Sequence, residues 1–427
     1  GIALRGAGTP ANQENRGGSI TLTEGHGMTI SEKILTEKAG EEVSAGEIVV
    51  ADLDLMMFHD GTFHLVREAW NDIQNSKVEN PDDVVMVIDH SAPPPTEGAA
   101  NLHNQLRDFA GNHGIQLYDS GEGICHQLVP ERGHVVPGDL VVGADSHTVT
   151  YGGINAFSTG IGATDMASAL HTGKLWFKVP ETIRVNLSGK LSSGIFSKDL
   201  ILWLAGELTA DGATYKTLEF GGEGLKNLSI SARFTVANMA IELGGKAGIM
   251  EPDEKTLNWV EKHSSQRPNP VEPDPNPDYE QVVDLDTSQL VPMVASPHAV
   301  DNVSEVTDLE STDIDQAFIG TCTNGRLEDL KEAANIAEGN EVADDVRLIV
   351  AAASRDIYRK ASEEGYLDTL VGAGAAVITP GCGPCLGTHN GIPGDDETVI
   401  STANRNFKGR MGNDSAGIYL GSPATVM

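Results

Sequence analysis

Short, fully apolar runs alternate with polar loops and helical segments along the chain. Residues 84–88 (VVMVI) and 140–142 (LVV) are two such runs. A strand that is buried on both faces of a parallel sheet is continuously apolar, whereas a strand with one wet face alternates. Both runs therefore predict central strands of a parallel sheet. The first run ends directly at Asp89, and the second is followed closely by Asp145.

The alternation is clearest toward the carboxyl end of the chain. It predicts strands at 317–319, 348–351 and 375–379, separated by helices at 326–338 and 355–364. Asn324 is a candidate N-cap for the first of these helices, because its side chain can accept from a free backbone N–H. The order strand–helix–strand–helix–strand predicts a parallel sheet with helices on its faces.

Three α/β domains are predicted. Val179-Pro180 marks a weak boundary, and residues 267–279 are rich in Pro, Asp, Asn and Glu, which is typical of a solvated loop. Residues 29–32 (TISE) match a capping box, so the first helix should begin there and residues 1–27 should be a flexible extension. The predicted domains are residues 28–182, 183–296 and 297–427.

Composition adds a strong negative charge. The 427 residues include 62 Asp and Glu against 29 Lys and Arg, which gives a net charge of −33. A field of this sign repels phosphate backbones and anionic lipids, so neither nucleic acid nor a membrane surface is an expected partner. The acidic residues are distributed along the whole chain. This distribution is typical of a halophilic protein, because a high salt concentration in the cytoplasm screens the repulsion between the negative charges. The alternative is an ordinary acidic protein.

Neither a membrane span nor a disulfide framework is expected. No apolar run approaches the roughly 20 residues that a span needs, and residues 1–27 contain no apolar signal core. Four cysteines in 427 residues are too few for a disulfide scaffold, so a reducing, cytoplasmic location is expected.

Three of the four cysteines follow predicted strands. Cys322 comes after the strand at 317–319, and Cys382 and Cys385 come after the strand at 375–379. Because ligands bind beyond the carboxyl ends of strands in such sheets, the three thiols are expected to meet at one edge. In a reducing compartment this arrangement favours a metal ion or a cluster over a disulfide.

Two other interpretations of these cysteines stay open from the sequence. Residues 382–385 (CGPC) have the spacing of a thiol–disulfide redox pair, and three cysteines with a histidine are a known zinc set. Cys125 is expected to be a buried, small apolar residue. A cluster that is held by only three thiolates leaves one iron open, and an open iron can act as a Lewis acid on a substrate hydroxyl and carboxylate.

Ionisable residues at the other strand ends indicate acid–base chemistry. The candidates are Asp89 with His90, His126, and Asp145 with His147. A histidine beside a carboxylate has a fixed tautomer and can hold a proton near neutral pH.

Polar residues later in the chain indicate an anionic substrate. Asn238 and Glu242 lie four residues apart on a predicted helix and therefore on one face. Asn404, Arg405 and Arg410 gather near the carboxyl end of a chain that is poor in cations. Arginine is the usual fork for carboxylates, so this group favours a carboxylate substrate.

Taken together, five segments resemble the aconitase superfamily, most closely the large subunits of archaeal-type 3-isopropylmalate dehydratases and homoaconitases. The segments are residues 121–127 (GEGICHQ), 143–148 (GADSHT), 318–325 (FIGTCTNG), 380–385 (PGCGPC) and 404–410 (NRNFKGR). The resemblance covers the chain from about residue 28 to its end. It implies three α/β domains with parallel-rich sheets around a central [4Fe–4S] cluster, without the swivelling fourth domain of single-chain aconitases.

The resemblance also implies roles for the candidate residues. Cys322, Cys382 and Cys385 would hold one [4Fe–4S] cluster whose fourth iron binds substrate. The implied acid–base pairs are Asp89 with His90, His126 with Asp145, and His147 with Glu242. The residues implied to line the cluster pocket or to bind substrate carboxylates are Asn238, Asn404, Arg405 and Arg410.

The implied reaction removes and re-adds water across adjacent carbons through an alkene, so that a hydroxyl migrates. The expected substrate is 2-isopropylmalate, interconverted with 3-isopropylmalate in leucine biosynthesis. The alternative is homoaconitase or another hydro-lyase of a 2-hydroxy di- or tricarboxylate, such as a methylmalate-type enzyme.

Two departures from single-chain aconitases bear on this function. The sequence ends at Met427, soon after the arginine motif, so a small subunit is expected to supply the swivel domain with its serine base. Thr150 stands where aconitase itself has an asparagine, which weakens citrate as the substrate. Some aconitase relatives bind RNA, but the net charge of −33 argues against that function here.

Overall fold

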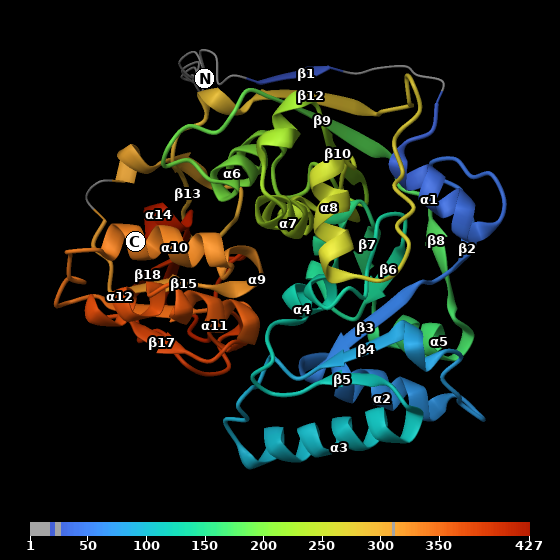
Figure 1. The fold of residues 1–427 in the computed structure, drawn as a ribbon, viewed down its shortest axis with the longest axis horizontal. Helices are drawn as coiled ribbons and strands as arrows, with labels where there is room; N and C mark the ends of the chain where they lie inside the picture. Colours follow the sequence, from blue (N-terminus) through green and yellow to red (C-terminus); the bar gives the residue numbers. More distant parts are fainter. Residues whose placement is uncertain (1–17, 22–26, 310–311) are drawn as a thin grey trace, which may run out of the picture.

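The computed structural model describes residues 18–21, 27–309 and 312–427 (Figure 1). Within them, three larger β-sheets and one two-stranded sheet are covered by helices. Most neighbouring strands in the larger sheets run parallel. The expectation of an α/β fold with parallel-rich sheets is confirmed.

The first sheet has five parallel strands in the order β5-β4-β3-β6-β7. Its strands are β3 (Leu55–His59), β4 (Val84–Val87), β5 (Gln116–Tyr118), β6 (Leu140–Gly143) and β7 (Phe157–Gly160). The two continuously apolar runs are β4 and β6, and both strands are buried throughout. The helices of this region are α1 (Ile30–Ala39), α2 (Asp60–Asp72), α3 (Glu97–His113), α4 (Cys125–Glu131) and α5 (Ala163–Thr172), and the small sheet pairs β2 (Ile48–Asp52) with β8 (Lys174–Lys178).

The second sheet has the order β1-β12-β9-β10-β11, in which only β1 is antiparallel. Its strands are β1 (Gly18–Thr21), β9 (Thr182–Ser188), β10 (Thr217–Gly221), β11 (Ala247–Met250) and β12 (Gln281–Asp286). The helices beside it are α6 (Ser197–Leu208), α7 (Ile230–Asn238) and α8 (Glu254–His263). Residues 18–21 of the predicted extension thus form a strand, and residues 1–17 and 22–26 lie outside the described residues.

The third sheet has the order β14-β13-β19-β18-β15-β16-β17, with β19 through β17 all parallel. Its strands are β13 (Met293–Ala295), β14 (Val303–Glu305), β15 (Gln316–Ile319), β16 (Arg347–Ala351), β17 (Ala376–Ile378), β18 (Thr398–Ser401) and β19 (Gly417–Leu420). Its helices are α9 (Thr321–Asn324), α10 (Leu327–Ala337), α11 (Arg355–Glu363), α12 (Tyr366–Gly372), α13 (Gly383–Leu386) and α14 (Pro423–Val426). The predicted strand–helix alternation is confirmed here, whereas the domain boundaries stay predictions.

Two predicted helix starts have different outcomes. The capping box is confirmed, because Thr29 and Glu32 exchange side-chain-to-backbone hydrogen bonds of 2.9 and 3.3 Å at the start of α1. The predicted N-cap at Asn324 was wrong, since Asn324 ends α9 and Arg326 caps α10. The carboxylate of Asp329 takes over the capping bond by accepting from the Arg326 N–H at 2.9 Å.

The first and third sheets are joined by main-chain contacts. Gly123 forms an isolated antiparallel bridge with Ser354, and Ile124 N–H donates to the carbonyl of Ala353 at 2.9 Å. A Cβ on Gly123, whose φ is +147°, would lie 2.8 Å from that same carbonyl oxygen. Only glycine permits this approach, and the approach fixes the carboxyl edges of the two sheets relative to each other.

Candidate active site

The carboxyl ends of the first and third sheets face one cavity. It is lined by His90, His126, Asp145, His147, Thr321, Cys322, Cys382, Cys385, Leu386, Asn404, Arg405 and Arg410. The other predicted site residues, Asp89, Asn238 and Glu242, each contact a lining residue. Helices α4, α7 and α9 lie in the middle of the molecule between the two sheets (Figure 1). The structure therefore brings together all the residues that the sequence singled out.

The three cysteines approach the cavity from two loops of the third sheet. Cys322 lies on α9 directly after β15, and Cys382 and Cys385 lie at α13 after β17. Cys322 and Cys385 are buried, and none of the three is in a disulfide. Cys125 is also buried and belongs to the apolar core of the first sheet, as expected.

Amide and guanidinium N–H groups point at two of the sulfurs. The Nδ2 atoms of Asn238 and Asn404 lie 3.2 and 3.5 Å from Sγ of Cys322. Nη2 of Arg410 lies 3.3 Å from Sγ of Cys385. Hydrogen-bond donors around sulfur stabilise thiolates and tune iron–sulfur clusters.

The spacing of the sulfurs distinguishes between metal groups. Tetrahedral zinc with bonds of about 2.3 Å holds its sulfurs about 3.8 Å apart. Among the described residues, the sulfurs of Cys322, Cys382 and Cys385 do not form a group within 4.8 Å of one another. The three sulfurs are therefore farther apart than sulfurs bound to one zinc ion, and cysteine thiols are the ligand type that iron–sulfur clusters use.

Burial opposes a redox role for the CGPC segment. It raises the pKa of the Cys382 thiol well above its ordinary value, with Asp89 adding to the effect. It also raises the pKa of Cys322 to about 12, with Cys385 adding to the effect. A nucleophilic redox cysteine requires a lowered pKa. Cys322 and Cys382 can lose their protons only if a positively charged group in the cavity stabilises the thiolates.

Asp145 is surrounded by histidines. Its Oδ1 lies 2.8 Å from Nε2 of His126 and accepts the main-chain N–H of His147 at 2.7 Å. Its Oδ2 lies 3.2 Å from Nε2 of His59. Burial opposes ionisation, but His126 and the other histidines outweigh it and hold the pKa of Asp145 well below its usual range.

His90 and His126 have opposite pKa shifts. Nδ1 of His90 lies 2.7 Å from Oδ1 of Asp89. Burial disfavours the charged imidazole, but Asp89, Asp60 and Asp145 outweigh burial and raise the pKa of His90 to about 9. Burial is the larger effect at His126 and lowers its pKa. At neutral pH the site therefore holds a protonated His90 beside a neutral His126.

Asp60 is a site residue that sequence reasoning missed. Its carboxylate accepts the main-chain N–H groups of Asp89, His90 and Ser91 at 3.0, 2.9 and 2.8 Å. It thereby fixes the loop that carries the protonated histidine.

His59, which immediately precedes Asp60, was also missed. Its ring stacks on that of His90 with the centroids 3.7 Å apart. Its Nδ1 accepts from the Gly61 N–H at 3.1 Å, so in the neutral imidazole Nε2 carries the proton toward Asp145. Both residues follow the apolar run of residues 55–58, the same strand-end pattern that identified Asp89.

Glu242 connects two other site residues. Its Oε1 lies 2.9 Å from Nε2 of His147 and accepts from Nε of Arg405 at 2.7 Å. Burial opposes ionisation of Glu242, but His147 and Arg405 outweigh it and lower its pKa. The prediction that Glu242 and Asn238 share one helix was wrong. Helix α7 ends at Asn238, and Glu242 lies on the 3₁₀ turn that follows it.

Asn238 is part of a series of side-chain hydrogen bonds that runs from Asn404 to Thr150. Its Oδ1 accepts from Nδ2 of Asn404 at 3.1 Å, and its Nδ2 donates to Oγ1 of Thr150 at 2.7 Å. Thr150 in turn donates to the His147 carbonyl at 2.6 Å. Thr150 therefore supports the cavity from behind the lining residues.

The two predicted substrate arginines differ in their environment. Arg405 is held by Glu242 and by Oγ of Ser146, which lies 2.9 Å from Nη2. Arg410 lines the same cavity, and its buried Nε has no hydrogen-bond partner. Glu242 thus holds Arg405 in an ion pair, whereas the hydrogen bond of Arg410 goes to the Cys385 sulfur.

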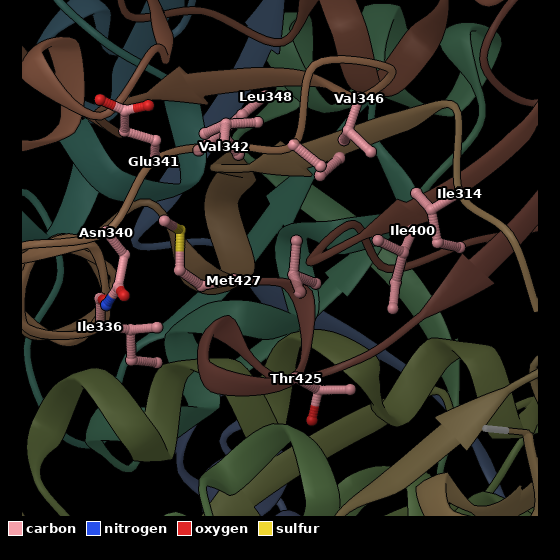
Figure 2. Close-up of a pocket in the computed structure, with 13 residues that line it drawn as sticks. Ile314, Ile336, Asn340, Glu341, Val342, Val346, Leu348, Ile400, Thr425 and Met427 are labelled. Carbon is pink, nitrogen blue, oxygen red and sulfur yellow. The ribbon is translucent and has the colours of Figure 1, made fainter.

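Another pocket lies in the third sheet beside the chain end (Figure 2). Ile314, Leu348 and Ile400 line it, together with Ile336 of α10 and Met427. Among the described residues that line it, the side chains are mostly aliphatic and include neither histidine nor cysteine, and Glu341 is the one ionisable residue. A single carboxylate does not form a cluster of acid–base or metal-binding groups.

None of the helices in the described part of the chain combines the length and the apolar character that crossing a bilayer requires.

Comparison with known proteins agrees with this geometry. The sequence model of the aconitase family (aconitate hydratase) matches residues 32–311 and 302–427. The chain belongs to the aconitase family. The sequence-based recognition is thus confirmed.

Aconitase-family relatives at high identity have a consistent set of names. The 3-isopropylmalate dehydratase large subunit 1 of Methanopyrus kandleri is 50% identical over 401 residues, which cover 94% of this chain and 96% of that protein. The protein of the same name from Thermotoga maritima is 48% identical over 403 residues, covering 94% and 96%. A probable methanogen homoaconitase large subunit of Methanothermobacter thermautotrophicus is 47% identical over 405 residues, covering 93% and 95%.

The fold has a solved counterpart. Thermococcus kodakaraensis aconitase X, in its holo-form, matches with a TM-score of 0.50 and 14% identity, covering 86% of this chain and 88% of that chain. At this identity the match supports the aconitase fold alone.

Proposed function

We propose that this aconitase-family chain is the cluster-binding large subunit of a hydro-lyase that interconverts 2-isopropylmalate and 3-isopropylmalate by dehydration and rehydration. The observation that carries the proposal is the cavity itself. One wall has three cysteine thiols, and the other has a protonated His90 beside ionised Asp145. The names of the dehydratase relatives support the substrate.

In this proposal Cys322, Cys382 and Cys385 hold one [4Fe–4S] cluster. When bound, the cluster supplies a Lewis-acidic iron for the substrate hydroxyl and carboxylate. Asn238 and Asn404 orient the Cys322 sulfur through their N–H groups.

His90 is the proposed acid for the departing hydroxyl. Asp89 holds its Nδ1, which leaves Nε2 as the nitrogen that can deliver a proton within the cavity. A pKa of about 9 keeps that proton in place at neutral pH. Asp60 positions the histidine by binding its main-chain N–H.

The other two pairs orient the substrate and its hydrogen bonds. Asp145 fixes the ring of His126, and Glu242 fixes the ring of His147. Arg405 holds Glu242 in place, while Arg410, which lines the cavity, binds a substrate carboxylate.

A small subunit is the proposed partner. The relatives' names contain the words large subunit, which supports a second chain. The described residues that line the cavity include no serine, the residue type that the family resemblance assigns to the base. We infer that the partner supplies it from its swivel domain.

The test is an anaerobic assay of this chain mixed with a small subunit from the same source. Either isopropylmalate isomer should give ultraviolet absorbance from the conjugated alkene, and each chain alone should give none. Turnover of homocitrate in preference to isopropylmalate would assign the chain to homoaconitase, the alternative supported by a relative of 47% identity. No turnover of any 2-hydroxy acid by the complex would refute the hydro-lyase.

We further infer that the protein works in a salty cytoplasm. A net charge of −33 gives strong self-repulsion that salt screens. Thermal unfolding should therefore shift to a lower temperature in dilute buffer and recover in concentrated KCl. Equal stability in both would refute the halophilic assignment.

A further inference from the structure

Lys198 is a fully buried lysine on α6 that contacts the loops around the cavity. Its Nζ donates to the carbonyl oxygens of Thr402 and Ala403, both at 2.9 Å, and to Oγ1 of Thr323 at 3.3 Å. Nζ also lies 3.4 Å from Sδ of Met239. Among the described residues it forms no ion pair with a carboxylate within 4.0 Å.

The partners of this ammonium are sequence neighbours of cavity residues. Thr323 follows Cys322, and Ala403 precedes Asn404. One side chain from the second sheet's α6 therefore connects the loop after β15 with the loop after β18. Both loops contribute to the cysteine wall of the cavity.

A buried ammonium without a nearby anion is costly. Burial lowers the pKa of Lys198 to about 7, and the largest opposing influences come from Cys322, Asp329 and Cys385. Asp329 is a poor counter-charge, because burial and Glu328 raise its own pKa to about 7.

Glu242, the other carboxylate that acts on Lys198, is already paired with His147 and Arg405. Neither carboxylate is therefore free to balance the ammonium in the cluster-free chain.

We propose that Lys198 is a positioning residue whose buried ammonium provides the counter-charge for the cysteine-held cluster and joins the loops that carry Cys322 and Asn404. This inference rests on the proposed cluster. Without an anionic partner the buried ammonium destabilises the cluster-free chain, and it stabilises the chain once a negatively charged cluster is bound beside the loops that it joins.

Removing the charge should therefore have opposite effects in the two states. Lys198→Met should leave the cluster-free chain as stable as the wild type or more stable, and should destabilise the loaded chain. A purely structural lysine, valued only for its hydrogen bonds, would lower the stability of both states equally.

The experiment measures the unfolding temperature of the full chain before and after anaerobic loading with iron and sulfide. The variants are Lys198→Met and Lys198→Gln, the second of which retains amide donors without the charge. The control is Lys246→Met, which changes a partly buried lysine whose Nζ lies 3.4 Å from the Gly160 carbonyl. Iron and sulfide analysis verifies loading in every sample.

Loading should raise the unfolding temperature of the wild type and of Lys246→Met by the same amount, and that increment should fall by half or more in both Lys198 variants. The reduction potential of the cluster should also become more negative in Lys198→Gln, because a nearby positive charge is lost. Equal increments and equal potentials would overturn the role of Lys198 and leave the cluster standing. A wild type that takes up no iron or sulfide would overturn the cluster, and this inference with it.

Discussion

The main-chain N–H of Cys382 donates a hydrogen bond to the carbonyl oxygen of Asp89, with the two atoms 2.8 Å apart. A second bond of 2.8 Å joins Oγ1 of Thr388 to the carbonyl of His90. The loop that carries two cysteines is thus attached to the loop that carries the proposed acid. These two contacts set the distance between the cysteine loop and His90, which explains how residues from two sheets can act on one substrate.

Asp60→Asn tests how the acid loop is held. The carboxylate accepts three successive N–H groups, whereas an amide offers one oxygen and turns an NH₂ group toward the remaining donors. Denaturant unfolding should show a loss of roughly 2–3 kcal/mol, and turnover by the complex should fall because His90 is misplaced. Asp72→Asn, at the exposed end of α2, is the control and should change neither quantity. Wild-type values in Asp60→Asn would contradict the role of this carboxylate.

Asp89→Asn tests the protonation of His90. The proton on His90 is present below a pKa of about 9 and is lost as pH rises through it, so turnover should decline across that range. Asp89 is the largest of the influences that raise this pKa, so the variant should move the alkaline limb of the pH–rate profile to lower pH. An alkaline limb that stays in place would exclude His90 as the titrating group.

Substitutions of Arg410 and Arg405 should change different steady-state constants. Arg410→Lys loses a planar guanidinium that lines the cavity and should raise KM by about tenfold, equivalent to roughly 1.4 kcal/mol, with little change in stability. Arg405→Lys should mainly lower kcat, because Arg405 holds Glu242 against His147. Arg359→Lys, whose side chain is 67% exposed, is the control. Identical effects of the two site variants would contradict the distinction.

The buried Asp139, which does not line the active-site cavity, should make the free energy of unfolding depend on pH. Burial, together with Asp54 and Asp83, raises its pKa from the ordinary 3.8 to about 7. The folded state therefore binds this proton more tightly than the unfolded state, and the carboxyl group destabilises the fold increasingly as pH rises from about 4 to about 7.

Asp139→Asn keeps an oxygen for the Val136 N–H, which donates to the carboxylate at 2.8 Å, and it removes the ionisation. It should stabilise the protein at pH 8, by as much as about 4 kcal/mol, and have little effect at pH 4. Unfolding by urea at the two pH values measures this difference. Destabilisation at pH 8 would show that the carboxylate is favourable there.

Much of this site could be predicted because it follows a strand-end rule. The apolar runs of β4 and β6 predicted strands, and Asp89 and Asp145 then had to lie at the carboxyl edge of a parallel sheet. The same rule applied to β15 and β17 predicted that Cys322 and Cys382 would converge. His59 and Asp60 obey it too, and they were missed because no motif was associated with them.

Other features depend on contacts between distant segments, which sequence spacing does not contain. Arg405 pairs with Glu242 across 163 positions of sequence, and this contact distinguishes it from Arg410. Lys198 sits in an ordinary helical pattern, and its hydrogen bonds to Thr402 and Ala403 arise only when α6 packs against the loop after β18. Asn324 has no capping role because α10 begins at Leu327 with Arg326 as its N-cap, and the Asn324 side chain instead donates to Asp329 at 3.0 Å.

The central claim is that Cys322, Cys382 and Cys385 hold an iron–sulfur cluster. The most direct measurement is the content of iron, acid-labile sulfide and zinc per chain after anaerobic purification, for the wild type and for Cys322→Ser. The account predicts between about three and four iron atoms and as many sulfides in the wild type, little of either in Cys322→Ser, and a wild-type value in Cys125→Ser. About one zinc per chain without sulfide would contradict it.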